Sequence, residues 1–308
     1  MFQVKNKLYS KVHFDNFLKE NYYQFNYLNH YQKLLINETS NSDTENDNDI
    51  GWSCTIKSIQ MLFASYLAKN HCADKIIPII YKDSGFISVH SFIKMAYKLK
   101  YKETLGDYYG IHKSLCVFNN LIRKYDHNYK ILNYEFYMTT DNIIDITQIH
   151  IYKPTILLFS TRLGANKLEN YYKELILKAF TSCQFDGLLG GVGQSCYFFI
   201  AKHTCADNLI YLDPHFVTDY NENISLNDLK ATNYLCTHID TLDPSMTFCF
   251  SYRNYKEFLE LKKFLEKNTI FDITNKEAYI NINSCETNNS KRSNKKLKEN
   301  EDGDWALC

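Results

Sequence analysis

The stretch NDNDIGWSCTIKSIQMLF, residues 46–63, passes without a break from polar, acidic sequence into an amphipathic pattern. The spacing of its apolar side chains predicts a helix over residues 54–69, with Ser53 placed to serve as the N-cap. This helix constrains the fold most, because its apolar stripe needs a core to pack against, and it puts Cys54 in its first turn. The apolar stripe consists of Ile56, Ile59, Phe63, Tyr66 and Leu67.

The other apolar patterns predict helices first and mostly strands afterwards. Helical spacing recurs over residues 87–100, 111–125, 168–181 and 254–267. Short apolar runs predict strands over residues 155–159, 196–201, 208–213 and 246–252. The second and third of these runs flank a short polar turn, which is typical of a hairpin. The order predicts an α+β fold with an antiparallel sheet in the second half of the chain.

Composition excludes several classes of protein. The 308 residues are 45% hydrophobic with a net charge of zero, so we expect a sizeable core and no nucleic-acid partner. No apolar run approaches the roughly 18 residues of a membrane-spanning helix. The first residues lack the apolar region of a signal peptide, so the ten cysteines are expected to be free thiols in the cytosol.

Two polar segments interrupt the globular pattern. Residues 37–50, NETSNSDTENDNDI, are acidic without an aromatic residue and predict a mobile loop. Residues 284–304 carry a basic block and then an acidic one, which is typical of a tail. We therefore expect one globular domain over residues 1–283 and a disordered tail over residues 284–308.

Cys54 is a candidate nucleophile because of its predicted place at a helix start. Backbone N–H groups without intrahelical partners point outward there and stabilise a thiolate. A small buried thiol that only packs is the alternative. A nucleophilic thiol also needs a base with an orienting partner.

The stretch IYLDPHF, residues 210–216, supplies the best candidate for that base. Asp213 and His215 are two residues apart, and in extended backbone such side chains point to the same side. Pro214 between them restricts the backbone and offers no competing donor. An aspartate that accepts from Nδ1 leaves Nε2 of the histidine free to face a thiol. The alternative is that Asp-Pro begins an ordinary turn.

Two further patterns are weaker. The stretch GLLGGVGQS, residues 187–195, fits neither phosphate-binding glycine motif and predicts a turn, or a close approach of a ligand to the backbone. Four potential zinc ligands form two pairs far apart in the sequence, so a zinc-stabilised structural protein is an alternative. These ligands are His203, Cys205, Cys236 and His238.

Taken together, six motifs in order resemble the autophagins, the autophagy cysteine proteases that process a ubiquitin-like modifier. The resemblance covers nearly all of residues 8–266. The motifs are DIGWSCTIKSIQMLFASYL (49–67), GDYYG (106–110), YKPTILLFSTRLG (152–164), DGLLGGVGQSCYFFIA (186–201), IYLDPH (210–215) and LDPSMTFCF (242–250).

The resemblance implies a papain-like cysteine protease fold with a small accessory subdomain, needing no metal or other cofactor. It implies cleavage after a C-terminal glycine of the modifier precursor and release of the modifier from phosphatidylethanolamine. Cys54 would be the nucleophile, His215 the base and acid, and Asp213 its orienting partner. The Cys54 backbone N–H would form the oxyanion hole with Tyr27, whose segment FNYLNHY, residues 25–31, resembles a further family motif.

The resemblance also implies a lid over the cleft, with glycines giving it mobility. Its residues would be Tyr108, Gly190, Gly191, Val192, Gly193, Gln194 and Ser195. Three positions depart from the family pattern. Ser53 replaces a glycine, Tyr108 replaces a tryptophan, and Leu28 replaces a basic residue.

The acidic stretch ENEDGDWALC, residues 299–308, resembles a family segment that docks on the same modifier. Trp305 would fill a pocket, Asp302 and Asp304 would face basic residues, and Cys308 would be a small second anchor. A solvated tail with one tryptophan is the alternative.

The expected partners are the modifier precursor and its lipid-linked form, with contact to autophagic membranes through that substrate. Two alternatives share this machinery. One is a papain-like hydrolase of another ubiquitin-like tail, and the other is an inactive homologue that only binds the modifier.

Overall fold

The computed structural model describes residues 1–30, 47–101, 106–129, 134–139 and 143–274. The helices are α1 (Lys11–Asn21), α2 (Cys54–Lys69), α3 (Val89–Lys98), α4 (Ile111–Tyr129), α5 (Asn170–Ala179) and α6 (Tyr255–Lys267). The strands are β1 (Phe2–Val4), β2 (Lys7–Tyr9), β3 (Tyr27–Asn29), β4 (Glu135–Thr139), β5 (Ile143–Asp145), β6 (Thr155–Arg162), β7 (Phe185–Val192), β8 (Ser195–His203), β9 (Asn208–Leu212), β10 (Val217–Asp219), β11 (Leu235–His238), β12 (Ser245–Tyr252) and β13 (Asp272–Thr274).

The main sheet runs in the order β11-β9-β8-β7-β12-β6-β4, with the β1–β2 pair attached to β8. Its neighbouring strands are antiparallel except β4 and β6, which are parallel. Two small parallel pairs lie apart from it, β3 with β10 and β5 with β13. The short pair of β3 and β10 matters most for function, because it joins the beginning of the chain to the segment that follows His215.

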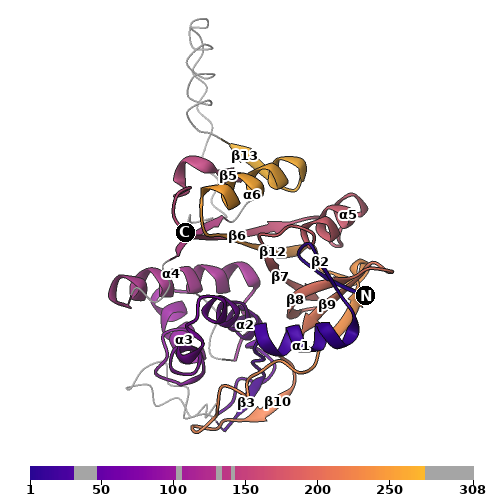
Figure 1. Ribbon diagram of the computed structural model, residues 1–308. Helices are drawn as coiled ribbons and strands as arrows, with labels where there is room; N and C mark the ends of the chain where they lie inside the picture. The colour runs from indigo at the N-terminus through magenta and orange to yellow at the C-terminus, as the bar shows by residue number, and fades with distance from the viewer. Residues whose placement is uncertain (31–46, 102–105, 130–133, 140–142, 275–308) are drawn as a thin grey trace, which may run out of the picture.

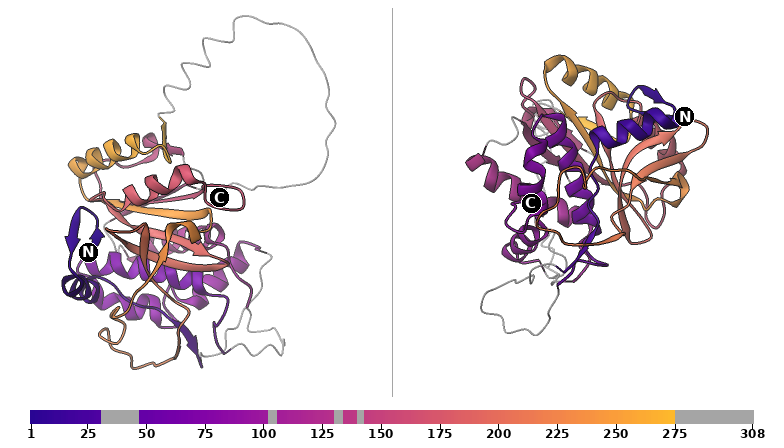
Figure 2. Two further views of the ribbon diagram at one scale, coloured as in Figure 1. Left: turned by 90° about the vertical axis from the view of Figure 1, so that its right-hand side faces the viewer. Right: turned by 60° about the horizontal axis from the view of Figure 1, so that its bottom comes forward.

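Side chains along the strands point alternately to the two faces of the sheet, which separates the interior into two cores. In β8, Phe198 and Ile200 face one core while Phe199 faces the other, as the two-residue period of a strand requires. Helices α1 to α4 cover the first face of the sheet, and α5 and α6 cover the second (Figures 1 and 2). The sheet is therefore enclosed between two helical layers.

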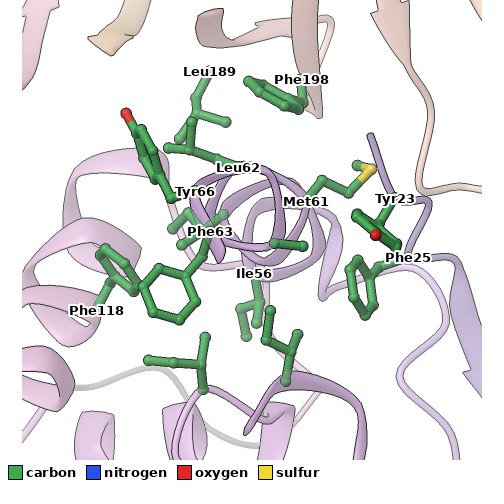
Figure 3. Close-up of a cluster of buried hydrophobic side chains, with 14 of the residues drawn as sticks. Tyr23, Phe25, Ile56, Met61, Leu62, Phe63, Tyr66, Phe118, Leu189 and Phe198 are labelled. Atoms are coloured by element: carbon green, nitrogen blue, oxygen red, sulfur yellow. The ribbon is translucent and has the colours of Figure 1, made fainter. Parts of the chain in front are cut away.

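Helix α2 lies inside the first core. Its residues from Cys54 to Leu67 are all buried, which fits a helix surrounded by protein rather than one with a solvent face. Figure 3 shows aromatic side chains from several parts of the chain around it, among them Tyr23, Phe118 and Phe198. These packed surroundings hold Cys54, the first residue of α2, and its thiol in a fixed position.

Most predicted elements are confirmed. The helix over residues 54–69 is α2, residue for residue, and β8 and β9 form the predicted hairpin. The α+β class is confirmed as well. Helix α1 was not predicted, because its apolar residues are few in a polar segment; Phe14 and Leu18 alone are buried from it.

The prediction for the glycine stretch is largely wrong, since residues 187–192 belong to strand β7. Gly190 and Gly191 pair with Tyr197 and Cys196 of β8, so strand pairing holds them. The turn is confined to Gly193 and Gln194, with φ of 55° and 68°. Positive φ at both central residues is what a two-residue hairpin turn of type I′ needs.

The structure describes the end of the predicted acidic loop but not the predicted tail. Residues 37–46 of the acidic loop and residues 284–308 of the tail lie outside the described residues. At the end of the loop, however, Asp49 is fully buried, so the mobile-loop prediction is wrong there. Within the described ranges, no helix is long and apolar enough to cross a membrane.

Candidate active site

Strand pairing brings residues from the start of the chain against the predicted base. Strand β3 pairs in parallel with β10, and the Tyr27 backbone N–H donates to the Pro214 carbonyl at 2.9 Å. The Gln24 side-chain amide donates to the Asp213 carbonyl at 2.5 Å. These contacts hold the loop after β9 in place, which is the loop that carries Asp213 and His215.

Asp213 and His215 form the predicted contact. The His215 Nδ1 atom lies 2.5 Å from Asp213 Oδ1, and the His215 backbone N–H donates to the same oxygen at 2.9 Å. Both side chains are partly buried, which strengthens a charge-assisted hydrogen bond. Asp213 therefore fixes the orientation of the imidazole ring.

Cys54 is the first residue of α2, as predicted, and its side chain is hydrogen-bonded to His215. The predicted N-cap position of Ser53 is confirmed. Its ψ of 6°, however, departs from the extended value of most N-caps, and its hydroxyl makes no cap hydrogen bond. Its φ of −91° is ordinary for serine, so the replacement of glycine introduces no backbone strain.

Opposing effects set the pKa values of Cys54 and His215. Burial alone raises the pKa of the Cys54 thiol, but hydrogen bonds from His215, the Cys196 backbone and Tyr27 lower it below its ordinary value. Burial alone lowers the pKa of His215, but its contacts with Asp213 and Cys54 raise it to about 9. Each group stabilises the charged form of the other, so the site favours a thiolate–imidazolium pair.

Aromatic rings frame the imidazole. The Tyr27 ring meets His215 edge to face, with ring centroids 5.3 Å apart, and the Tyr197 ring lies 5.1 Å away. Tyr27 is buried and hydrogen-bonded to Cys54. Burial raises the pKa of its hydroxyl well above the ordinary value, so Tyr27 keeps its proton and remains a donor.

The predicted cleft residues mostly meet in one cavity of about 1010 Å³. Tyr108 and the residues Gly190, Gly191, Gly193 and Gln194 line it, together with Cys196 and Asp243. Val192 and Ser195 instead form the strand pair that closes the turn. The cavity thus lies between the Tyr108 segment and the β7–β8 hairpin.

Sequence reasoning missed several residues beside the site. Asp49 and Lys57 form a buried ion pair, with Nζ and Oδ2 2.7 Å apart. A lysine within an otherwise buried helix was the available signal, because a buried charge needs a partner. Gln24 and Cys196 left no local signal, since their roles depend on segments remote in sequence.

No metal centre forms in the described part of the chain, where no three His, Cys, Asp or Glu side chains are grouped to hold an ion. The zinc alternative needs His203, Cys205, Cys236 and His238 together, and these four residues do not form such a group. The predicted docking residues Asp302, Asp304, Trp305 and Cys308 lie outside the described ranges.

A thiol that opens a buried helix and meets a His–Asp pair from the loop after strand β9 of the sheet is typical of the papain-like class of cysteine peptidases. Within this class, the model of the Peptidase C54 catalytic domain matches residues 15–264. The chain belongs to the Peptidase C54 family, and the resemblance to the autophagins is confirmed.

Known relatives agree with this assignment. The chain is 26% identical over 251 residues to the cysteine protease ATG4 of Candida albicans, covering 77% of this chain and 55% of that protein. It is 28% identical over 219 residues to the probable cysteine protease atg4 of Schizosaccharomyces pombe, covering 68% and 66%. The cysteine protease ATG4B of Xenopus laevis is 24% identical over 266 residues, covering 69% and 67%. The chain spans about half the length of the Candida relative.

Proposed function

We propose that this protein is a thiol protease that cleaves a ubiquitin-like autophagy modifier after its C-terminal glycine. The observation that carries the proposal is the hydrogen bond between Cys54 and His215, together with the distance of 2.5 Å between His215 Nδ1 and Asp213 Oδ1. Family membership supports the choice of modifier, because the relatives are named cysteine protease ATG4.

The geometry supports a two-step acyl transfer. The Cys54 thiolate attacks the carbonyl carbon of the glycine, and its backbone N–H and the Tyr27 hydroxyl donate to the oxyanion that forms. The His215 imidazolium then protonates the departing amine. Water, deprotonated by His215, hydrolyses the resulting thioester and regenerates the thiol.

The same chemistry extends to the lipid-linked modifier. A precursor and a phosphatidylethanolamine conjugate both present a glycine carbonyl joined to an amine, so one acyl-transfer site serves both. We include release of the modifier from phosphatidylethanolamine in the proposal. Contact with autophagic membranes would then come through the substrate, and the cytosolic location stays a prediction from the sequence.

The cleft supports a substrate that ends in glycine. Tyr108 and the β7–β8 turn line one cavity together with Cys196, which packs against Cys54 and Tyr27. A side chain on the residue that supplies the carbonyl would meet these walls. The turn of Gly193 and Gln194 is the part proposed to act as the lid.

The test is cleavage of a purified modifier precursor, with the new C-terminus read by mass spectrometry. We expect a product that ends at the glycine, and no product from the Cys54→Ala variant. A second reaction uses lipid-linked modifier on phosphatidylethanolamine vesicles and follows its release into the supernatant. An active enzyme that cuts neither substrate, but cuts another ubiquitin-like tail, would overturn the choice of modifier.

A further inference from the structure

A buried ion pair links the nucleophile helix to the segment before it. Lys57 lies on α2 three residues after Cys54, and its side chain is 1% exposed. Asp49, whose side chain is 0% exposed, precedes the helix and lies 2.7 Å from the lysine nitrogen through Oδ2. The two groups stay together, because separating them would leave each charge buried without compensation.

The other oxygen of the same carboxylate holds strand β3. Asp49 Oδ1 accepts from the Leu28 backbone N–H at 2.6 Å, and the Asp49 backbone N–H donates to the Leu28 carbonyl at 3.2 Å. Leu28 directly follows Tyr27, so these two bonds fix the peptide on one side of the tyrosine. On the other side, the Tyr27 N–H is bound to Pro214 of the base loop.

Tyr27 is thereby fixed from two directions. Pro214 ties it to the loop that carries His215, and Asp49 ties it through Lys57 to the helix that carries Cys54. Packing alone tolerates small sliding movements of a strand past a helix, whereas hydrogen bonds to a fixed carboxylate do not.

We propose that Asp49 and Lys57 are positioning residues that set the Tyr27 hydroxyl against the Cys54 sulfur for oxyanion stabilisation. The inference rests on the proposed function only in taking Tyr27 as an oxyanion donor. The pair touches neither substrate nor thiol, so it acts through Tyr27. Displacement of a catalytic donor by about 1 Å costs on the order of 10²-fold in rate.

The test replaces both charges at once, Asp49→Asn with Lys57→Met, so that no unpaired charge stays buried. We expect the folded double variant to lose about 10- to 100-fold in kcat on a short glycine-ended reporter, with KM little changed. The rate at which iodoacetamide alkylates Cys54 should fall much less than kcat, because alkylation forms no oxyanion and His215 and the Cys196 backbone still lower the pKa of the thiol. If the double variant does not fold, the single variant Lys57→Gln is measured instead, because its side chain still offers Asp49 a hydrogen-bond donor.

The decisive comparison repeats the substitution in a Tyr27→Phe background. A pair that works through the Tyr27 hydroxyl should cause no further loss of kcat there. Lys57→Arg should restore most activity, since it keeps the charge. Lys69→Gln is the matched control, because Lys69 pairs with the buried Asp186 at the far end of α2 and should leave kcat unchanged.

Two results would overturn the inference: wild-type kcat in the folded double variant, or an undiminished loss in the Tyr27→Phe background. The reporter separates this test from the proposed function. An enzyme that cleaves the reporter but no modifier precursor contradicts the proposed substrate and leaves the positioning comparison intact.

Discussion

At the scale of single residues, the chemistry of the site depends on hydrogen bonds that outweigh burial. Cys54 and Cys196 are both buried and close together, yet the pKa values of their thiols are shifted in opposite directions. Burial raises the pKa of Cys196 to about 12, while His215 and two further donors lower that of Cys54. Contact with the imidazolium therefore distinguishes Cys54, the proposed nucleophile, from Cys196.

Selective alkylation tests this distinction. At about pH 6, where ordinary thiols are protonated, iodoacetamide should modify Cys54 first and abolish activity in step with labelling. Peptide mapping by mass spectrometry identifies the labelled site. Labelling of Cys196 or of the exposed Cys183 ahead of Cys54, with activity lost in parallel, would contradict the assignment of the nucleophile.

Replacement of Asp213 by asparagine tests the orienting partner. Asp213→Asn keeps the size of the side chain but favours the wrong imidazole tautomer, so kcat should fall by up to about 10⁴ while the fold is kept. Circular dichroism checks the fold. Turnover near the wild-type rate would show that Asp213 does not orient His215.

The pH dependence of kcat/KM also tests the role of Asp213. The His215 pKa is raised to about 9, so the imidazolium is present below that pH and is lost as the pH rises through it. Wild-type kcat/KM should therefore fall above about pH 9. Asp213→Asn removes a hydrogen bond that raises this pKa, so the alkaline limb should move to lower pH. A limb that stays in place would contradict the role of Asp213 in setting it.

At the scale of elements, strand β7 shows why this sheet needs glycine in its interior. Gly187 has a φ of 144°, and a Cβ there would lie 2.5 Å from the Phe198 ring and 2.7 Å from the Phe199 carbonyl. The close approach lets β7 and β8 pair next to α2. Gly187 is therefore needed for packing, whereas Gly193 lies in the turn beyond the paired residues of β7 and β8.

A methyl group at this position should destabilise the fold. Gly187→Ala combines a disfavoured φ with contact against backbone, so we expect a loss of about 2–4 kcal/mol in the free energy of unfolding, measured by denaturant titration. Gly110→Ala is the control, since no atom lies within 4 Å of its added Cβ, and its change should stay within about 1 kcal/mol. Equal losses in the two variants would contradict the packing argument.

At the scale of the whole molecule, the site is assembled from four stretches that are remote in sequence. Strand β3, the start of α2, the β7–β8 hairpin and the loop after β9 meet at one end of the sheet. Residues 284–308 lie outside the described ranges, so a docking role for them remains a proposal. A tethered second contact raises the effective concentration of substrate at the cleft without altering the chemistry.

Trp305→Ala tests that role. Capture of the intact modifier should weaken, most visibly on membranes, while hydrolysis of a short glycine-ended reporter stays unchanged. Binding is measured by calorimetry with Cys54→Ala enzyme, with and without the tryptophan substitution. Equal affinities in the two titrations would exclude the docking peptide.

Local patterns in the sequence predicted those structural features that depend on residues close together along the chain. The start of α2 at Cys54, the β8–β9 hairpin and the contact of Asp213 with His215 each follow from residues a few positions apart. Periodicity and backbone restriction act over that range, which is why these features could be predicted.

Only the tertiary structure decided what depends on packing between remote segments. The sequence placed Asp49 in a mobile loop, yet it is buried because Lys57 needs a partner and the Leu28 amide needs an acceptor. The glycine stretch became a strand because β8 and β12 supply its hydrogen bonds from both sides. Burial and pairing of this kind are properties of the assembled core, so the sequence determined the reacting groups and the fold determined how they are held.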